Sequence, residues 1–225
     1  MDISPFYDKK VACLHCTTSF TTTKIRSRFV RVSSHESDFK PVYSDPKINP
    51  TFYNVAVCPH CGFSFTDEFS PYFAPGTKVS ISKQITSQWN ARSFCAVRDI
   101  DEAIEAYKLA YLSALFKMEK TVTIAGITLR IAWLNRDKSM IEEENRFLTI
   151  ARNLYMKSYT EGDFAGTQMS ETKVMYLIAE LSWKIGDKEE AVLGFSRVLE
   201  SQRTASEPKI IELAKERWQE IRTIK

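Results

Sequence analysis

Four of the five cysteines form two pairs with the spacing of metal-binding turns. Cys13 and Cys16 belong to "CLHC", and Cys58 and Cys61 belong to "CPHC". A C-x-x-C turn places two sulfurs on one edge of a tetrahedron, and thiolates suit Zn²⁺, which has no electronic preference of geometry. The sequence therefore predicts one structural Zn²⁺ site with four thiolate ligands: Cys13, Cys16, Cys58 and Cys61.

The two pairs are separated by 41 residues, so a shared site requires the intervening chain to fold back, as in a zinc ribbon. Four protein ligands leave no position for water or substrate, which predicts a structural role. His15 and His60 lie inside the knuckles, where intervening side chains usually point outward, and we do not expect them to be ligands. Cys95 has no partner in the sequence and is expected to be a buried packing residue.

A dithiol catalyst is another use of a C-x-x-C pair, because a thiol at a helix N-terminus has a lowered pKa. The segment "NVAVCPHCGFSFT" instead indicates a strand before the second pair and a strand or loop after it. A zinc–thiolate redox sensor stays open as an alternative. The sequence has no glycine-rich phosphate loop, H-E-x-x-H or G-x-S-x-G motif, and these observations favour a protein that is not an enzyme.

The elements around the cysteines differ from those that follow. Residues 1–75 carry short β-branched and aromatic runs between turns, whereas residues 76–225 are long helix-forming segments. Capping-box patterns, with an acceptor three residues before a glutamate, begin at Asp99, Ser139 and Asp187. The predicted fold class is α+β, mostly α, with a zinc-ribbon-like domain over 1–75 and a helical domain over 76–225.

The segment "YLIAELSWKIGDKEEAVLGFSRVLE", residues 176–200, resembles a tetratricopeptide repeat, with small residues where two helices would cross. A second copy over 99–116 would pair with a helix over 79–96. Stacked hairpins of this kind leave a concave face, and we expect that face to bind a protein or peptide partner. Four side chains would point toward it: Arg92, Arg130, Tyr176 and Trp183.

The net charge of +3 over 225 residues is too small to indicate nucleic-acid or membrane binding by itself. A local alternative is the basic run "KIRSRFVR", in which Lys24, Arg26 and Arg28 would project from one strand face and bind nucleic acid. Residues 1–75 carry eight Lys and Arg against seven Asp and Glu, which is weak support. The chain shows no signal peptide and no apolar run of spanning length, which predicts a cytoplasmic protein with reduced thiols.

Five short stretches carry a likeness to a known family: residues 7–10 before Cys13, Asp38 with Phe39, Asn49 with Pro50, Tyr53, and residues 58–62. Through them nearly the whole chain resembles an uncharacterised family of bacterial cytosolic proteins, described as a domain of unknown function. That family combines an N-terminal two-knuckle region with tetratricopeptide-like helices. It has no established activity, so the resemblance implies an architecture and no function.

Overall fold

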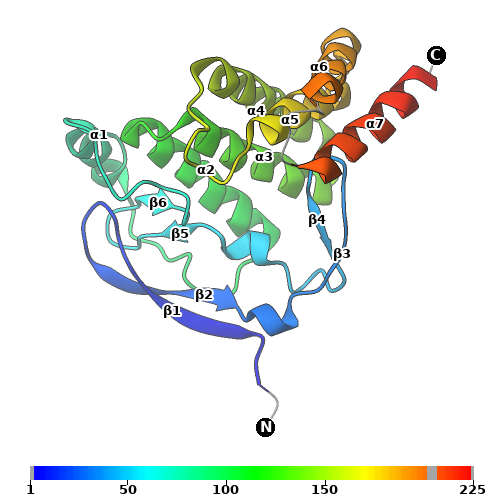
Figure 1. The fold of residues 1–225 in the computed structure, drawn as a ribbon. Helices are drawn as coiled ribbons and strands as arrows, with labels where there is room; N and C mark the ends of the chain where they lie inside the picture. Colours follow the sequence, from blue (N-terminus) through cyan, green and yellow to red (C-terminus); the bar gives the residue numbers. More distant parts are fainter. Residues whose placement is uncertain (1–2, 202–206, 224–225) are drawn as a thin grey trace. The chain divides into compact units, whose positions relative to one another are not determined.

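The computed structural model describes residues 3–201 and 207–223 (Figure 1). They divide into two compact units that interleave along the chain. Unit 1 takes the described residues up to His35, Pro41–Glu119 and Trp133–Met140; unit 2 takes Glu36–Lys40, Lys120–Ala132 and the described residues from Ile141 onward. The units do not follow the predicted boundary between residues 75 and 76. That residues 1–75 and 76–225 fold as two independent domains stays a prediction.

The strands of the described chain form three short antiparallel pairs: β1 (Phe6–Ala12) with β2 (Ser19–Ile25), β3 (Val32–His35) with β4 (Pro41–Tyr43), and β5 (Ala56–Val57) with β6 (Ser64–Phe65). In β2, Phe20 and Thr22 are buried while Thr21 is exposed. This alternation is the period of two that a strand with one covered face shows, and it ends at Thr23, which is also buried and bonds to Cys95 O. The 3₁₀ turns η1 (Ser27–Phe29) and η2 (Pro50–Tyr53) follow β2 and precede β5.

Unit 1 also contains the helices α1 (Thr77–Gln84) and α2 (Ile100–Lys117), with the 3₁₀ turn η3 (Thr86–Gln88) after α1. The predicted capping box opens α2: the Asp99 carboxylate accepts from Glu102 N at 2.8 Å, and the Glu102 carboxylate accepts from Asp99 N at 3.1 Å. α2 packs against β5, β6 and α1. Ser64 N also donates to Ser113 Oγ at 3.0 Å, which joins β6 to the helix.

The prediction of one helix over residues 79–96 is wrong for the residues after Gln84, where α1 ends. After η3 the chain is irregular, because its polar groups bond to other parts of unit 1. Trp89 Nε1 donates to Pro59 O at 2.9 Å, and Cys95 O accepts from Thr23 N at 2.9 Å. These tertiary bonds outweigh the weak helix propensity of the segment. Cys95 is only half-buried, which corrects its expected place in a buried core.

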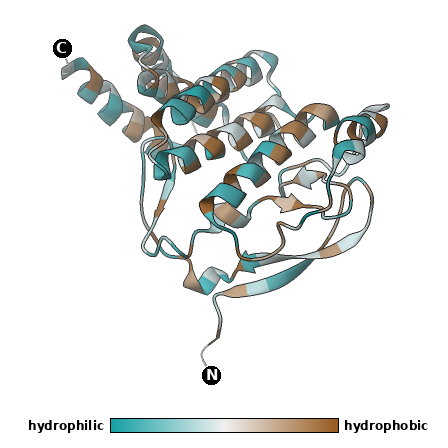
Figure 2. Cartoon of the chain, turned by 180° about the vertical axis from the view of Figure 1, so that it is seen from behind, coloured by the Kyte–Doolittle hydropathy of each residue, from teal (hydrophilic) through white to brown (hydrophobic). Residues whose placement is uncertain are grey.

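The remaining helices are α3 (Thr121–Asp137), α4 (Ile141–Glu161), α5 (Glu171–Lys184), α6 (Lys188–Glu200) and α7 (Pro208–Thr223). The long helices carry both hydrophobic and hydrophilic residues along their length (Figure 2). In unit 2, α5 packs against α4 and α6, and α7 packs against α5 and α6. The α+β, mostly α fold class is confirmed. No helix within 3–201 and 207–223 has the length and apolar composition that a membrane span requires.

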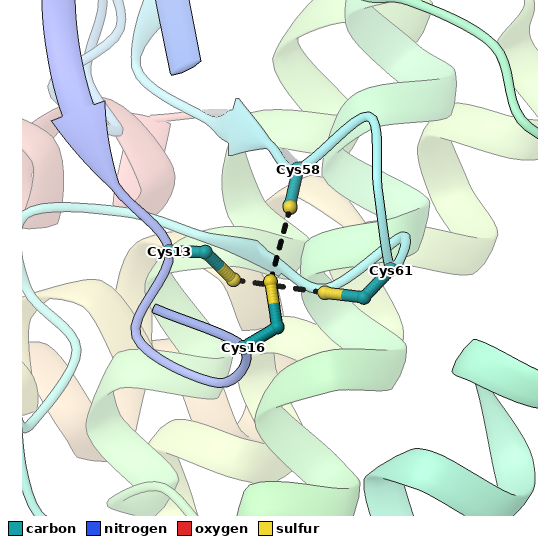
Figure 3. Close-up of side chains that lie close together, drawn as sticks. All are labelled: Cys13, Cys16, Cys58 and Cys61. Carbon is teal, nitrogen blue, oxygen red and sulfur yellow. Dashed lines mark hydrogen bonds between the residues drawn. The ribbon is translucent and has the colours of Figure 1, made fainter. Parts of the chain in front are cut away.

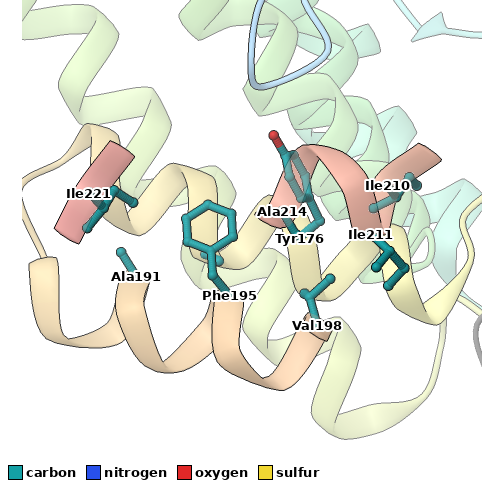
Figure 4. Close-up of a cluster of buried hydrophobic side chains, with 9 residues drawn as sticks. Tyr176, Ala191, Phe195, Val198, Ile210, Ile211, Ala214 and Ile221 are labelled. Carbon is teal, nitrogen blue, oxygen red and sulfur yellow. The ribbon is translucent and has the colours of Figure 1, made fainter. Parts of the chain in front are cut away.

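The buried cluster of α5, α6 and α7, here called the helical core, is apolar apart from one tyrosine hydroxyl (Figure 4). Its members are Tyr176, Ala179, Ala191, Phe195, Val198, Ile210, Ile211, Ala214 and Ile221. Small residues let α5 and α6 approach closely, since a Cβ added to Gly194 would lie 2.8 Å from Ala179 Cβ. The helical core is therefore set by side-chain size as well as by hydrophobicity.

Candidate metal centre

The first cysteine pair lies in the turn between β1 and β2, the first knuckle (residues 13–18). Cys13 N donates to Thr18 O, and Thr17 N donates to Cys13 O, each at 3.0 Å. Thr17 closes the turn with a φ of 61°, in the left-handed region that β-branched residues rarely adopt. The geometry of the first knuckle therefore carries local backbone strain.

The second pair lies in the turn between β5 and β6, the second knuckle (residues 58–63), and repeats the bonds of the first. Cys58 N donates to Phe63 O at 3.0 Å, and Gly62 N donates to Cys58 O at 2.9 Å. Gly62 takes the position of Thr17, with a φ of 73°. A Cβ at Gly62 would also lie 2.5 Å from the Trp89 ring, so this position requires glycine for two separate reasons.

The four sulfurs of the two knuckles converge, as Figure 3 shows. Cys13 Sγ lies 3.6 Å from Cys61 Sγ, Cys16 Sγ lies 3.7 Å from Cys58 Sγ, and all four lie within 4.8 Å of one another. Metal–sulfur bonds of about 2.3 Å in a tetrahedron place the sulfurs about 3.8 Å apart. The spacing and the donor set therefore fit a tetrahedral metal site, and each close pair links one knuckle to the other.

The four thiols are largely shielded from solvent, and the pKa values of Cys58 and Cys61 are shifted in opposite directions. Cys13, Cys58 and Cys61 are at most 3% exposed, and Cys16 is half-buried. Hydrogen bonds from the Cys13 and Cys61 thiols hold the pKa of Cys58 well below its ordinary value. Contacts with the Cys13 and Cys58 sulfurs, together with burial, raise the pKa of Cys61. Buried thiolates at this spacing repel one another, and a metal cation would offset that repulsion and their loss of hydration.

The two knuckle histidines lie in different surroundings. His60 is exposed, as expected. His15 does not point outward: its ring lies 5.8 Å from the Phe63 ring and 6.4 Å from the Phe73 ring, and its Nε2 lies 3.2 Å from Ser82 Oγ. Neither histidine belongs to the cluster that could hold a metal within the described chain. His15 therefore packs beside the site without joining it.

Trp89 supports the second knuckle and was not singled out from the sequence. Its Nε1 donates to Pro59 O at 2.9 Å, inside the C-x-x-C turn, while its ring covers Gly62. Because 30 residues separate Trp89 from Pro59, no local pattern points to this contact. An indole that fixes a ligand-bearing backbone turn is an outer-shell support of the kind that metal sites use.

The basic run forms no single cationic face. β2 ends at Ile25 and η1 follows, so the strand covers only the start of the run. Lys24 turns inward, where its Nζ donates to Tyr53 O at 2.5 Å and burial lowers its pKa. Arg26 and Arg28 are exposed. The expected shared face is therefore wrong for Lys24, and nucleic-acid binding by this run stays a prediction.

The four side chains expected on a concave face have separate environments. Tyr176 is fully buried, and its ring centroid lies 5.1 Å from that of Phe39. Trp183 packs against the helical core and is partly buried. Arg130 lies on α3 and is also partly buried. Arg92 belongs to unit 1, lies outside any helix and forms an ion pair with a glutamate. The expected exposure of Tyr176 is therefore wrong, because the chain's own residues cover it.

Residues 6–221 match a family described as "Uncharacterized protein conserved in bacteria (DUF2225)". The chain belongs to this family. No curated protein and no solved structure matches the chain. The resemblance to a bacterial family of unknown function is confirmed, and the cysteine cluster and helical C-terminal part agree with the architecture expected of it. The tetratricopeptide-like character of the DUF2225 helices stays a prediction.

Proposed function

We propose that this chain is a non-enzymatic adaptor in which a structural Zn²⁺ ion holds two hairpins together while the helices bind a protein or peptide partner. The convergence of four sulfurs within 4.8 Å, from two knuckles far apart in the sequence, supports the metal part. Zn²⁺ takes four thiolates tetrahedrally, and four protein ligands leave it no position for water or substrate. A structural role follows from that saturation.

The strands that carry the second knuckle are short, although Val57, Phe63 and Phe65 are buried there and both strands pack against α2. β5 and β6 have two residues each, and an isolated hairpin is at best marginally stable even when its strands are longer. A metal bound by both knuckles supplies folding free energy to such a region. A tetrathiolate site also needs reduced cysteines, so we place the action of the chain in a reducing compartment such as the cytosol.

The partner part of the proposal rests on unit 2. Its consecutive helices α4, α5 and α6 pack on one another, which is how helical repeat proteins build exposed peptide-binding faces. Trp183 is partly buried, with Lys188 Nζ 5.8 Å from its ring centroid, and Val192 and Leu193 of α6 are 36% and 47% exposed. Tyr176 is not part of the proposed contact surface because its ring is covered within unit 2.

The metal content of the purified chain tests the first part. We expect about one zinc per chain, lost in Cys13→Ser and in Cys58→Ser, because the two knuckles share one site. Cys95→Ser is the matched control, since Cys95 lies outside the cluster, and it should retain the metal. Zinc retained in either knuckle variant would contradict a four-thiolate site.

Photo-crosslinking in cells tests the second part. A crosslinker at position 193 should capture a defined protein, and Trp183→Ala should reduce that capture several-fold by removing an aromatic anchor. Lys10→Ala, an exposed substitution in unit 1, is the control and should leave the capture unchanged. Equal capture by all three chains, or no capture, would contradict a partner surface on unit 2.

A further inference from the structure

A cleft of about 500 Å³ lies where β1 begins and β2 ends, lined by Ile3, Tyr7, Arg26, Ser27 and Arg28. All five residues belong to unit 1. The cleft is shallow and largely open to solvent, so a ligand there would keep part of its surface exposed. The lining of the cleft combines two cations, one aromatic ring and one apolar side chain, a composition suited to an anion that carries a planar ring.

Arg26 is fixed in the cleft by its own neighbours. Its guanidinium carbon lies 5.1 Å from the Tyr7 ring centroid, and its Nε donates to Ser4 O at 3.3 Å. Its backbone N donates to Pro5 O at 2.9 Å. These contacts order the side chain and leave its two terminal nitrogens free to donate to a ligand, which lowers the entropy lost on binding.

Arg28 is positioned by the backbone of η1. Phe29 N donates to Arg26 O and Val30 N to Ser27 O, each at 3.0 Å, and the Arg28 guanidinium carbon lies 4.8 Å from the Phe29 ring centroid. Across residues 3–201 and 207–223, no carboxylate forms an ion pair with Arg26 or Arg28. Two exposed guanidinium groups without a carboxylate partner in the described residues therefore line one cleft.

We propose that this cleft binds a nucleotide unit, with Arg26 and Arg28 donating to its phosphate and with Tyr7 and Ile3 beside its base. Arginine matches phosphate oxygens with paired N–H donors, and aromatic side chains beside cations are the usual means of binding unpaired bases. The nucleotide unit belongs either to a free mononucleotide or to single-stranded RNA, which share this chemistry. The site is separate from the cysteine cluster and independent of the adaptor role.

Fluorescence anisotropy of the zinc-loaded full chain, with a labelled uridine oligonucleotide of about ten residues at about 50 mM salt, tests the proposal. The Arg26→Ala/Arg28→Ala chain should bind at least tenfold more weakly. For that variant, the slope of log affinity against log salt concentration should be shallower by about 1.4, the value for two lost phosphate contacts on a single strand. Arg28→Ala alone removes no hydrogen bond within the described residues, so it should leave the fold unchanged. It should show a smaller loss of affinity and a smaller change of the salt slope than the double variant.

Competition separates the two sources. Displacement of the oligonucleotide by uridine monophosphate at micromolar concentration supports a mononucleotide site, and displacement only by unlabelled RNA supports a single-strand surface. Lys10→Ala is the control: β1 projects alternate residues to opposite faces, so Lys10 lies on the face opposite Tyr7. No binding by the unmodified chain, equal weakening by Lys10→Ala, or equal displacement by inorganic phosphate would overturn the proposal.

Discussion

The cysteine cluster of unit 1 and the helical core of unit 2 differ in the side chains that each brings together. Around the cysteines, buried thiols lie among buried side chains such as Val57, Phe63 and Phe65, and the strands that carry the second knuckle, β5 and β6, have two residues each. In the helical core the buried groups are apolar or aromatic and come from three helices. Under the proposed function, order in the first region depends on a bound ion and on reduced thiols in addition to burial, whereas order in the second depends mainly on burial.

A metal site and an apolar cluster are two different ways in which a small number of residues can stabilise a fold. A metal site concentrates its stabilisation in four ligands, so the loss of one ligand affects the whole site. An apolar cluster distributes stabilisation over many contacts, so the loss of one side chain is graded by its volume. The two regions should therefore respond to different perturbations.

Removal of the metal should have the largest effect. Structural zinc contributes on the order of 10 kcal/mol in small metal-folded domains, which is comparable to the whole stability of a domain. A chelator under reducing conditions should abolish the hydrogen-exchange protection of peptides covering residues 12–19 and 56–65. Peptides of α5 and α6 should keep theirs. Equal loss in both regions would show one cooperative unit and contradict separate stabilisation; unchanged protection would contradict a structural metal.

Phe195→Ala should have the next largest effect, in the opposite region. Phe195 is fully buried, and its ring centroid lies 5.7 Å from that of Tyr176. Truncating a buried phenylalanine costs about 3–5 kcal/mol, which urea denaturation would measure as a lower midpoint for unit 2. Leu193→Ala, at a side chain 47% exposed, is the control and should change the midpoint little. Zinc affinity should be the same in all three chains, and a parallel fall in affinity would contradict separate stabilisation.

The parts that sequence reasoning predicted well depend on short-range chemistry. A C-x-x-C turn sets its own sulfur geometry, so the spacing of Cys13, Cys16, Cys58 and Cys61 was enough to predict the cluster. Two of the three predicted N-caps are equally local: the carboxylates of Asp99 and Asp187 accept from the amides three residues on, whereas Ser139 has a φ of 58° and α4 begins only at Ile141.

The parts that were missed depend on partners distant in the sequence. Alternation places Lys24 beside Arg26, yet Tyr53 O draws Lys24 inward from 29 residues away. The segment of Trp89 has an acceptable helical pattern, but its indole bonds to a knuckle. Tyr176 has the spacing of an exposed repeat position, but the loop formed by Glu36–Lys40 belongs to unit 2 and covers it. None of these partners can be read from periodicity.

Trp89→Phe should have a smaller effect, confined to the metal site. The substitution keeps a ring over Gly62 and removes the bond from Nε1 to Pro59 O. Loss of an outer-shell hydrogen bond typically weakens metal binding by about tenfold or more, equivalent to about 1.4 kcal/mol. Competition with a chromophoric chelator would measure it. Trp183→Phe is the matched control, and an equal change in zinc affinity for both variants would show that Trp89 has no particular role.

The smallest effect should come from Tyr176→Phe, which tests the one polar group of the helical core. The Tyr176 hydroxyl donates to Ser37 O at 2.9 Å. Near neutral pH, the loss of this bond should cost about 1 kcal/mol. Burial, followed by the charge of Glu180, raises the pKa of Tyr176 above its ordinary value. The folded state therefore holds this proton more tightly than the unfolded chain does.

The sign of the pH effect follows from that difference. The stabilisation is fully present below the unfolded pKa of about 10 and is lost as the pH rises through the folded pKa. Above pH 10 the unmodified chain should lose up to about 1.4 kcal/mol per pH unit relative to Tyr176→Phe, which lacks the ionisable group. Urea midpoints of the unmodified chain and of Tyr176→Phe, measured between pH 8 and 11, would test this. The higher midpoint of the unmodified chain should approach that of Tyr176→Phe only above pH 10. Parallel curves would place the hydroxyl in contact with water. Because alkaline pH keeps thiols deprotonated, the zinc content should stay constant over the same range, so this titration perturbs the helical core and leaves the cysteine cluster intact.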